Sequence, residues 1–439
     1  MHSRTVFVDF SKKAGKLKPL FSSSAIPVSD SPFYYDLTEH FSALGVDTVR
    51  LSPSETLSIG ISDIFPDFSL DPRFEASYNF THLDAAATMI KGQGMDVFLT
   101  LGEKPDRTRT SLRNLAPRDM EKWADICIGI VRHLNEGFAN GFKYGVKQVE
   151  IWQEADSLDS FRSSPEEYYE LYSLVSRRLK DRFPRLRIGG YSARGFYSLN
   201  HVDGSPDEKR SIDFLEGFLL HIAGRKAPLD FFSWKCFVSS AEELALHSNY
   251  ADSYLVNAGF KKAKSIVSDF NLRKGTADFI FDKSYPAFLA ASLISAEKSQ
   301  LDMLYYSDLS PTSALNALYS YDDRLKLRKY AAYGVAEAFG ELVSIGTAVD
   351  SGEDYRRELY TLAAGGKDRG ALLIVTGEYK GQLIVEVKNS PFPRCSVKGM
   401  AGGGERGAGV TSAASGVSLA SGRLTLKVGH HQVYLISFE

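Results

Sequence analysis

Residues 149–157 read VEIWQEADS and join a strand-like run to a polar end. Val149, Ile151 and Trp152 are apolar residues of the kind that form a buried strand, and the run stops at the acidic, turn-forming cluster that begins with Glu154. A barrel of parallel strands gathers its functional groups at the carboxyl ends of those strands. The carboxylate of Glu154 is therefore a candidate for chemistry.

The same pattern, a strand-like run with a polar end, recurs along the first three quarters of the chain. Short β-rich runs that end in small or polar residues cover 20–25, 48–52, 97–102, 149–154, 187–192, 230–237, 265–271 and 303–308. Segments with helical spacing lie between them, such as 117–140, and Ser164 followed by Pro165 marks the start of another helix. Eight alternating units predict an α/β fold, a (β/α)8 TIM barrel, with a doubly wound open sheet as the alternative.

The pattern changes after about residue 342. Strand-like runs at 355–363, 370–375, 382–388, 422–428 and 432–438 alternate with glycine-rich turns, which predicts a C-terminal β-sandwich. The opening run at 5–10 alternates in the same way and is expected to join it. We therefore expect a barrel over 14–342 and a sandwich formed by 1–13 plus 343–439.

The composition excludes several classes of protein. The 439 residues contain 44% apolar residues, enough for a large core, and 52 Lys plus Arg balance 54 Asp plus Glu without a block of like charge. No nucleic-acid partner is indicated. The longest apolar stretch, Ala287 to Ala296, is too short for a membrane span, and the start lacks the apolar core of a signal peptide. We expect no membrane partner and, by default, a cytoplasmic chain of unknown oligomeric state.

No metal or other cofactor is expected. The three cysteines are scattered, and the nine histidines show no metal-type spacing. The stretch GGGERG at 402–407 satisfies the spacing of a dinucleotide loop, but strand-type sequence follows it where a helix is required.

Polar residues at the strand ends are the candidate site residues. They are Ser52, Glu103, Gln153, Glu154, Ser192, Lys235, Asp269, Asn271, Tyr306 and Asp308. Among them, Glu154 and Asp269 are carboxylates that follow strongly apolar runs. Two carboxylates that face each other across a pocket are what glycoside cleavage requires, although such acids can also cap helices or pair with an arginine.

A family resemblance covers about residues 6 to 341 and implies more. The matching stretches include VDFSKKAGKLKPL at 8–20, SYNFTHLD at 77–84, RHLNEGFANGF at 132–142, VEIWQEAD at 149–156, DFFSWKCF at 230–237, SIVSDFN at 265–271 and LYYSD at 304–308. In these stretches the chain resembles the xylosidase-like enzymes of glycoside hydrolase family 39, which are retaining (β/α)8 glycosidases. The resemblance implies a glycosidase without a cofactor, acting on an oligosaccharide or other glycoside.

The resemblance also assigns the two carboxylates. The fourth strand of the family ends in WNEP, whose Glu is the general acid/base; here the stretch from Trp152 to Ala155 stands in that place, so Glu154 takes the role. Gln153 replaces the Asn that binds a sugar hydroxyl. The nucleophile of the family is a Glu on the seventh strand, and Asp269 falls on it, one methylene shorter.

Other positions are expected to bind substrate. The family often has His where Lys235 follows Trp234, and it shares Arg50, which supports the nucleophile there. Lys235 could keep Asp269 ionised or bind an acidic sugar. The expected substrate-binding residues are Gln153, Lys235, Trp234, Tyr306, Glu103, Arg50 and Asn271.

The substitutions leave two hypotheses. Either the chain is an active glycosidase with Glu154 as acid/base and Asp269 as nucleophile, or it is a silent barrel that binds carbohydrate or a protein partner. The distance between the two carboxyl groups discriminates between them. A value near roughly 5 to 5.5 Å supports retaining hydrolysis, whereas a separation beyond the inverting range, or Lys235 wedged between the two groups, rules out the first hypothesis.

Overall fold

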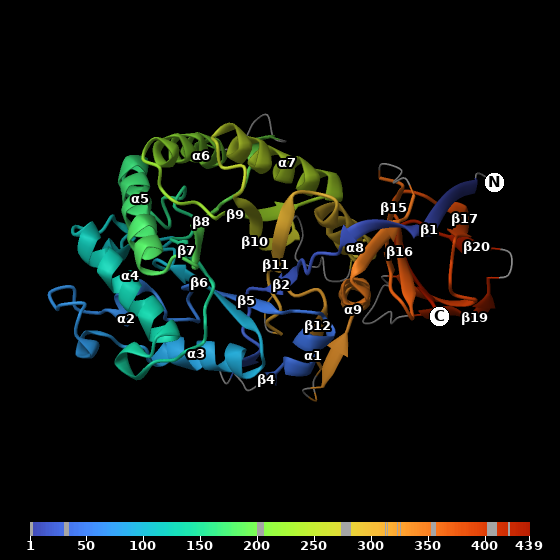
Figure 1. The fold of residues 1–439 in the computed structure, drawn as a ribbon, viewed down its shortest axis with the longest axis horizontal. Coiled ribbons are helices and arrows are strands. Elements are labelled where there is room, and N and C mark those ends of the chain that lie inside the picture. The colour runs from blue at the N-terminus through green and yellow to red at the C-terminus, as the bar shows by residue number, and fades with distance from the viewer. Residues whose placement is uncertain are drawn as a thin grey trace.

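The chain folds into a barrel and a smaller β-sandwich that lie side by side, with both termini in the sandwich (Figure 1). The computed structural model describes residues 3–29, 35–199, 206–273, 282–311, 313, 315–322, 324, 326–352, 357–401, 411–419 and 422–439. The glycine-rich stretch at 402–407 lies outside these residues. Among the described helices, none is both long and apolar enough to cross a membrane.

Eight parallel strands close into the barrel in the order β10-β11-β2-β5-β6-β7-β8-β9. They are β2 (Phe21–Ser23), β5 (Thr48–Leu51), β6 (Asp96–Leu101), β7 (Gln148–Ile151), β8 (Arg187–Ala193), β9 (Phe231–Val238), β10 (Lys264–Leu272) and β11 (Leu301–Tyr306). Each overlaps one of the eight predicted runs. The predicted TIM barrel is confirmed, and the doubly wound alternative is wrong.

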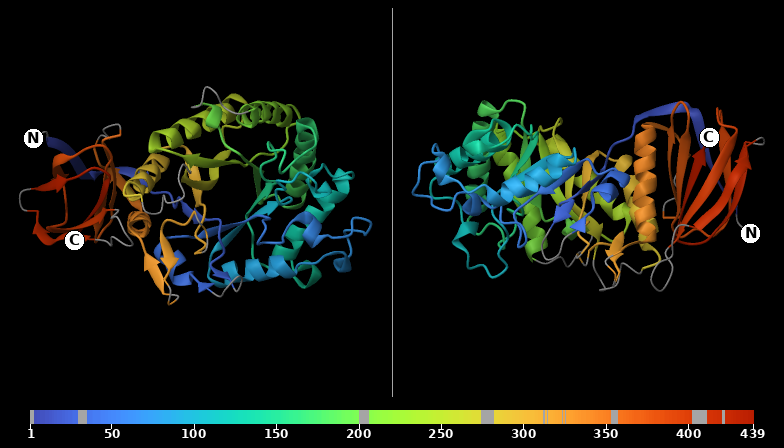
Figure 2. Two further views of the ribbon diagram at one scale, coloured as in Figure 1. Left: turned by 180° about the vertical axis from the view of Figure 1, so that it is seen from behind. Right: turned by 90° about the horizontal axis from the view of Figure 1, so that it is seen from below.

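Helices surround the barrel (Figure 2). They are α1 (Thr38–Ala43), α2 (Ile61–Ile64), α3 (Thr81–Gly92), α4 (Met120–Asn135), α5 (Pro165–Arg182), α6 (Pro206–Gly224), α7 (Ala241–Asn257), α8 (Tyr285–Glu297) and α9 (Ala331–Ile345). The predicted start of α5 is confirmed, because the Ser164 side chain accepts from the backbone of Glu167 while Glu167 accepts from the backbone of Ser164. The two short hairpins are β3 (Val28–Ser29) with β4 (Tyr35–Asp36) and β12 (Tyr319–Tyr321) with β13 (Leu327–Lys329).

The sandwich is one curled sheet in the order β19-β18-β21-β16-β15-β14-β1-β17-β20. Its strands are β1 (Ser3–Lys16), β14 (Thr347–Asp350), β15 (Leu359–Gly365), β16 (Gly370–Thr376), β17 (Gly381–Lys388), β18 (Arg394–Ala401), β19 (Thr411–Ser418), β20 (Arg423–Val428) and β21 (Gln432–Phe438). The first strand, β1, lies antiparallel to β14 and parallel to β17. The sequence patterns did not identify β14, β18 or β19.

The helix α8 explains the longest apolar run of the sequence. Helices normally show one apolar stripe, but a helix that is buried on all sides is apolar all round. In the structure α8 packs against α7 and α9 and also against the sandwich strands β15, β16, β18 and β21. Residues 287–296 are therefore a buried contact between the barrel and the sandwich.

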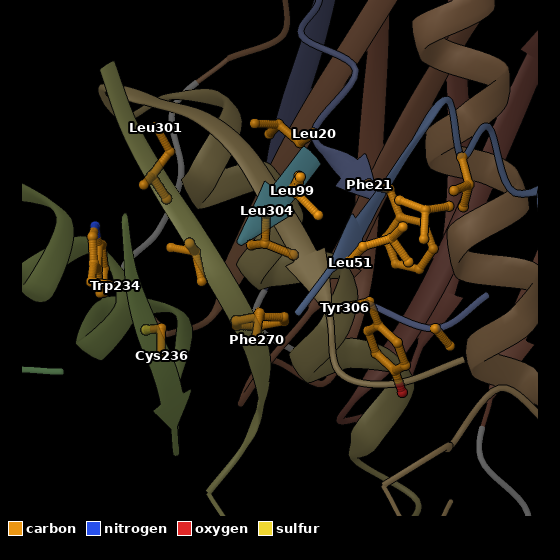
Figure 3. Packing of buried hydrophobic residues seen from close by; sticks show 14 of the residues in the cluster. Leu20, Phe21, Leu51, Leu99, Trp234, Cys236, Phe270, Leu301, Leu304 and Tyr306 are labelled. Atoms are coloured by element: carbon orange, nitrogen blue, oxygen red, sulfur yellow. The ribbon is translucent and has the colours of Figure 1, made fainter. Parts of the chain in front are cut away.

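Successive residues of the barrel strands alternate between the helices and the interior. Leu51, Leu99, Leu304, Trp234 and Tyr306 belong to the large core that also includes the helices (Figure 3). A separate small cluster contains Phe98, Phe231, Ile266 and Tyr305. The ring centroids of Phe98 on β6 and Phe231 on β9 lie 5.4 Å apart, although these strands are not neighbours. This contact must therefore cross the barrel interior, so that cluster fills it.

Candidate active site

A lysine joins the two predicted carboxylates. The Lys235 Nζ lies 2.6 Å from the Glu154 Oε1 and 3.1 Å from the Asp269 Oδ2. The three side chains are only 20%, 17% and 10% exposed, respectively. They come from β9, from the turn after β7 and from β10, so three strands converge on one ammonium group. The two carboxylate oxygens must therefore lie within about 5.7 Å of each other, which is the sum of the two distances to the shared nitrogen.

A tight turn places Glu154 at the end of β7. Trp152 and Glu154 have positive φ angles of 69° and 49°, a left-handed conformation that costs about 1 kcal/mol or more for each such residue. The turn is held because the Trp152 amide donates to Leu101 O at 2.7 Å and the Glu154 amide donates to Ser192 O at 3.2 Å. A Cβ at Gly102 would lie 2.9 Å from the Cα of Trp152, so this close approach requires glycine.

A β-bulge places Asp269 beside the lysine. The register between β10 and β9 shifts between Val267 and Asp269, after which Asp269 pairs with Lys235. Without the shift, the alternation of strand residues would turn residue 269 toward the helices, as it does Val267. The bulge therefore brings the predicted nucleophile into the interior.

A second buried ion pair, between Arg50 and Glu150, lies next to Asp269. The Arg50 Nε donates to the Glu150 Oε1 at 2.7 Å, and both side chains are almost fully buried. Glu150 also accepts from the Thr100 Oγ1 at 2.5 Å and the Ser233 Oγ at 2.7 Å. The Arg50 guanidinium approaches the Asp269 Oδ2 only to 3.6 Å. Arg50 is thus mainly the partner of Glu150, and Lys235 is the nearer cation to Asp269.

The bridging lysine stays charged. Burial alone would lower the pKa of Lys235, but the carboxylates of Asp269 and Glu154 more than offset this, and the pKa is raised above its ordinary value. For two neighbouring acids, burial outweighs the partners that lower the pKa. Burial raises the pKa of Asp156 to about 6 and also raises the pKa of Asp308.

Gln153 and Glu103 lie on the β6 side of the site. The Gln153 Nε2 donates to the backbone oxygens of Pro53, at 2.8 Å, and Glu103, at 3.2 Å. This orientation turns the amide oxygen of Gln153 away from those carbonyls. The Glu103 carboxylate is 3% exposed and accepts from the Ser62 amide at 2.8 Å. Burial raises the pKa of Glu103 to about 7.

Three predicted substrate-binding residues are not brought to this cluster. Trp234 is fully buried, and its Nε1 donates to the Ser265 Oγ at 3.0 Å. Tyr306 is fully buried as well (Figure 3), and its hydroxyl bonds with that of Tyr285 at 2.8 Å. Asn271 donates to Ser307 O and Leu315 O and accepts from Tyr285, so its amide serves the fold.

Sequence reasoning missed Glu150. A charged residue in the middle of the apolar run VEIW was a detectable signal, because a lone buried carboxylate requires a cation nearby. Since Glu150 and Arg50 lie on strands that are not neighbours, only the barrel topology shows that they meet. In the described part of the chain, no group of three or more His, Cys, Asp or Glu residues is arranged to hold a metal ion.

The fold and these residues define the chain as a (β/α)8 barrel with two carboxylates paired at the strand ends, as in glycoside hydrolases. The model of glycosyl hydrolases family 39 matches residues 58–273, which include Glu154, Lys235 and Asp269. Over these residues the chain is similar to family 39, and the resemblance seen in the sequence is confirmed.

Individual proteins are similar to this chain in sequence or in fold. A β-xylosidase from Geobacillus stearothermophilus is 24% identical over 192 residues, which are 40% of this chain and 34% of that protein. The matched part of this chain spans about a third of the length of that relative. A glucosidase from Croceicoccus marinus has a TM-score of 0.77 at 20% identity and covers 100% of this chain and 99% of its own. A monomeric β-xylosidase from Caulobacter crescentus has a TM-score of 0.70 at 14% identity, and the match covers 99% of each chain. The fold of these proteins extends over the sandwich as well as the barrel.

The buried pair beneath the site gives a first prediction. Glu150→Gln removes the charge that balances Arg50 and should lower the free energy of unfolding by about 3 to 5 kcal/mol. Thr100→Val, which removes a single hydrogen bond to the same carboxylate, should lower it by about 1.5 kcal/mol. Urea unfolding measures both. Equal effects of the two variants would contradict the pairing.

The buried Glu103 gives a second prediction. Its pKa of about 7 lies above the unfolded value of 4.5, so its contribution to stability is present at low pH and is lost as the pH rises through about 7. Glu103→Gln cannot ionise and should gain about 2 kcal/mol relative to the natural chain between pH 5 and pH 8. Exposed Glu121→Gln is the control. A difference that does not change with pH would contradict the burial of this carboxylate.

Proposed function

We propose that this chain hydrolyses a glycosidic bond with retention of configuration, with Asp269 as nucleophile and Glu154 as acid/base. The observation that carries the proposal is the separation of the two carboxylates. Their oxygens lie within about 5.7 Å of each other. Retaining enzymes need about 5 to 5.5 Å, whereas inverting enzymes need about 6.5 to 9.5 Å to admit a water.

The contacts of Asp269 suggest which oxygen attacks. Lys235 and Arg50 both approach the Oδ2 of Asp269, so the Oδ1 is the oxygen left for the sugar carbon. In the first step Oδ1 bonds to the anomeric carbon while the bond from that carbon to the aglycone oxygen breaks, and that oxygen leaves either with a proton from Glu154 or as an anion. In the second step water attacks the same carbon, the bond from that carbon to Oδ1 breaks and releases the Asp269 carboxylate, and Glu154 takes the proton of that water.

A second candidate is a barrel that binds carbohydrate without cleaving it. The position of Lys235 favours this candidate, because the ammonium lies between the two carboxylates, which is the arrangement that we expected to rule out retaining hydrolysis. The two observations point in opposite directions. We give more weight to the carboxylate separation, because the barrel strands fix it and because Lys235 contacts the Oδ2 of Asp269, which leaves the Oδ1 for attack on the sugar.

A trapping experiment tests the proposed reaction. The natural chain is incubated with 2,4-dinitrophenyl 2-deoxy-2-fluoroglycosides of xylose, glucose, galactose and arabinose, because the fluorine slows the second step and preserves the covalent intermediate. Mass spectrometry should show one added sugar, on the peptide that contains Asp269. The matched 2,4-dinitrophenyl glycosides should be cleaved, and Asp269→Asn should reduce that rate by at least about a thousandfold.

The controls separate the two candidates. Glu121→Gln, a change of an exposed helix carboxylate, should leave both trapping and turnover unchanged. Failure to label or cleave any of the glycosides, together with measurable binding of a free sugar by calorimetry, would replace hydrolysis with the carbohydrate-binding function.

A further inference from the structure

We propose that Lys235 restricts this site to glycosides whose leaving group departs as a stable anion, such as a phenolate, because its ammonium occupies the carboxylate that would otherwise protonate the leaving group. The inference rests on the proposed hydrolysis and specifies its substrate class. It follows from one contact, the 2.6 Å distance between the Lys235 Nζ and the Glu154 Oε1.

An ammonium group can only donate hydrogen bonds. In the contact with Lys235, the Glu154 Oε1 is therefore the acceptor and the ammonium is the donor. A proton on Glu154 would discharge one of the two partners of Lys235. Since the three side chains are mostly buried, breaking such a pair is strongly unfavourable. Lys235 thus occupies the Glu154 oxygen that would otherwise serve the leaving group.

The other charged groups around the site do not replace Lys235 as the partner of Glu154. They are Arg50 on β5, Glu150 on β7, Asp156 after β7, Asp269 on β10 and Asp308 after β11. Arg50 is held by Glu150 and lies 3.6 Å from Asp269. Lys235 is therefore the cation that balances both Glu154 and Asp269. No described residue places a second cation within salt-bridge distance of Glu154.

The two steps of retaining hydrolysis make opposite demands on Glu154. The first step needs a proton on Glu154 when the aglycone leaves as an alcohol. The second step needs a carboxylate that accepts a proton from water. The ion pair with Lys235 prepares Glu154 for the second step and hinders the first.

A good leaving group removes the conflict. When the aglycone is an acidic phenol, the bond from the anomeric carbon to oxygen breaks and the electron pair leaves with the phenolate. No proton from Glu154 is then required. General acid assistance is worth about 10² to 10⁴ in rate, so its loss penalises aliphatic and sugar leaving groups by that order and spares acidic phenols.

The test is a series of aryl glycosides of the sugar that the natural chain cleaves, with leaving groups from 2,4-dinitrophenol through 4-nitrophenol to phenol. The value of kcat/KM should fall steeply as the leaving group becomes more basic. Lys235→Met removes the charge and shortens the side chain by one atom, the ammonium nitrogen. It should raise the ratio of the phenyl rate to the dinitrophenyl rate by on the order of a hundredfold. This ratio is insensitive to a general loss of activity.

The role of Glu154 supplies an independent readout. In a chain that keeps Lys235, Glu154→Gln should change the rate at which the intermediate forms from the dinitrophenyl glycoside by less than about threefold. The same variant should slow hydrolysis of the intermediate by about 10² or more. Azide, which attacks without needing a base, should restore turnover. In the Lys235→Met background, Glu154→Gln should also slow cleavage of the phenyl glycoside by on the order of a hundredfold.

The possible failures are distinguishable. If the natural chain cleaves phenyl and dinitrophenyl glycosides at similar rates, or if Lys235→Met leaves the ratio unchanged, the role of Lys235 is refuted while hydrolysis stands. If even the dinitrophenyl glycosides of all four sugars resist cleavage, the hydrolase function fails and the inference with it. Should Lys235→Met not fold, Lys235→Gln replaces it, and the comparison of the phenyl and dinitrophenyl rates in the natural chain still decides.

Discussion

The ammonium of Lys235 is the interaction on which the rest of the site depends. It holds two carboxylates at the mouth of a barrel that would otherwise place like charges side by side with little solvent. Next to it, Arg50 balances the charge of the buried Glu150. Three buried carboxylates thus face two cations, and because each cation already has a close partner, a change of any one charge affects the others.

Two irregular backbone segments bring charged side chains from different strands to the ammonium of Lys235. The left-handed turn at Glu154 and the bulge before Asp269 are both departures from regular strand geometry. Such irregularities are found next to active sites because they redirect a side chain that the alternation of a regular strand would send elsewhere. The strained turn is tolerated because the Trp152 ring is packed in the core and its Nε1 donates to Ser160 O.

Much of this could be predicted from the sequence, and the limits have physical causes. The barrel followed from the alternation of strand and helix patterns, which are local properties. The strand ends gave Glu154 and Asp269 as candidates, and the family resemblance gave their roles. The strand β19 was missed because its sequence, TSAASGVS, consists mainly of small residues and lacks apolar alternation, whereas the alternation of residues 394–398 in β18 was a detectable signal.

The direction of a side chain was harder to predict than its position. Trp234 and Lys235 are adjacent on one strand, so in a regular strand only one of them faces the pocket. The sequence gives no means of choosing between them. The partners of Arg50 and Lys235 depended on the register between strands and on the bulge in β10, which are properties of the assembled barrel. A pattern in one sequence does not contain them.

The two carboxylates and the ammonium can be tested as a unit by double-mutant cycles on the free energy of unfolding. Lys235→Met is combined in turn with Glu154→Gln and with Asp269→Asn, and urea unfolding is measured at pH 7 and low salt. An ammonium shared by two buried carboxylates predicts a coupling energy above about 1 kcal/mol in each cycle, more than exposed ion pairs give. Additivity within about 0.5 kcal/mol in both cycles would show that Lys235 does not bridge Glu154 and Asp269.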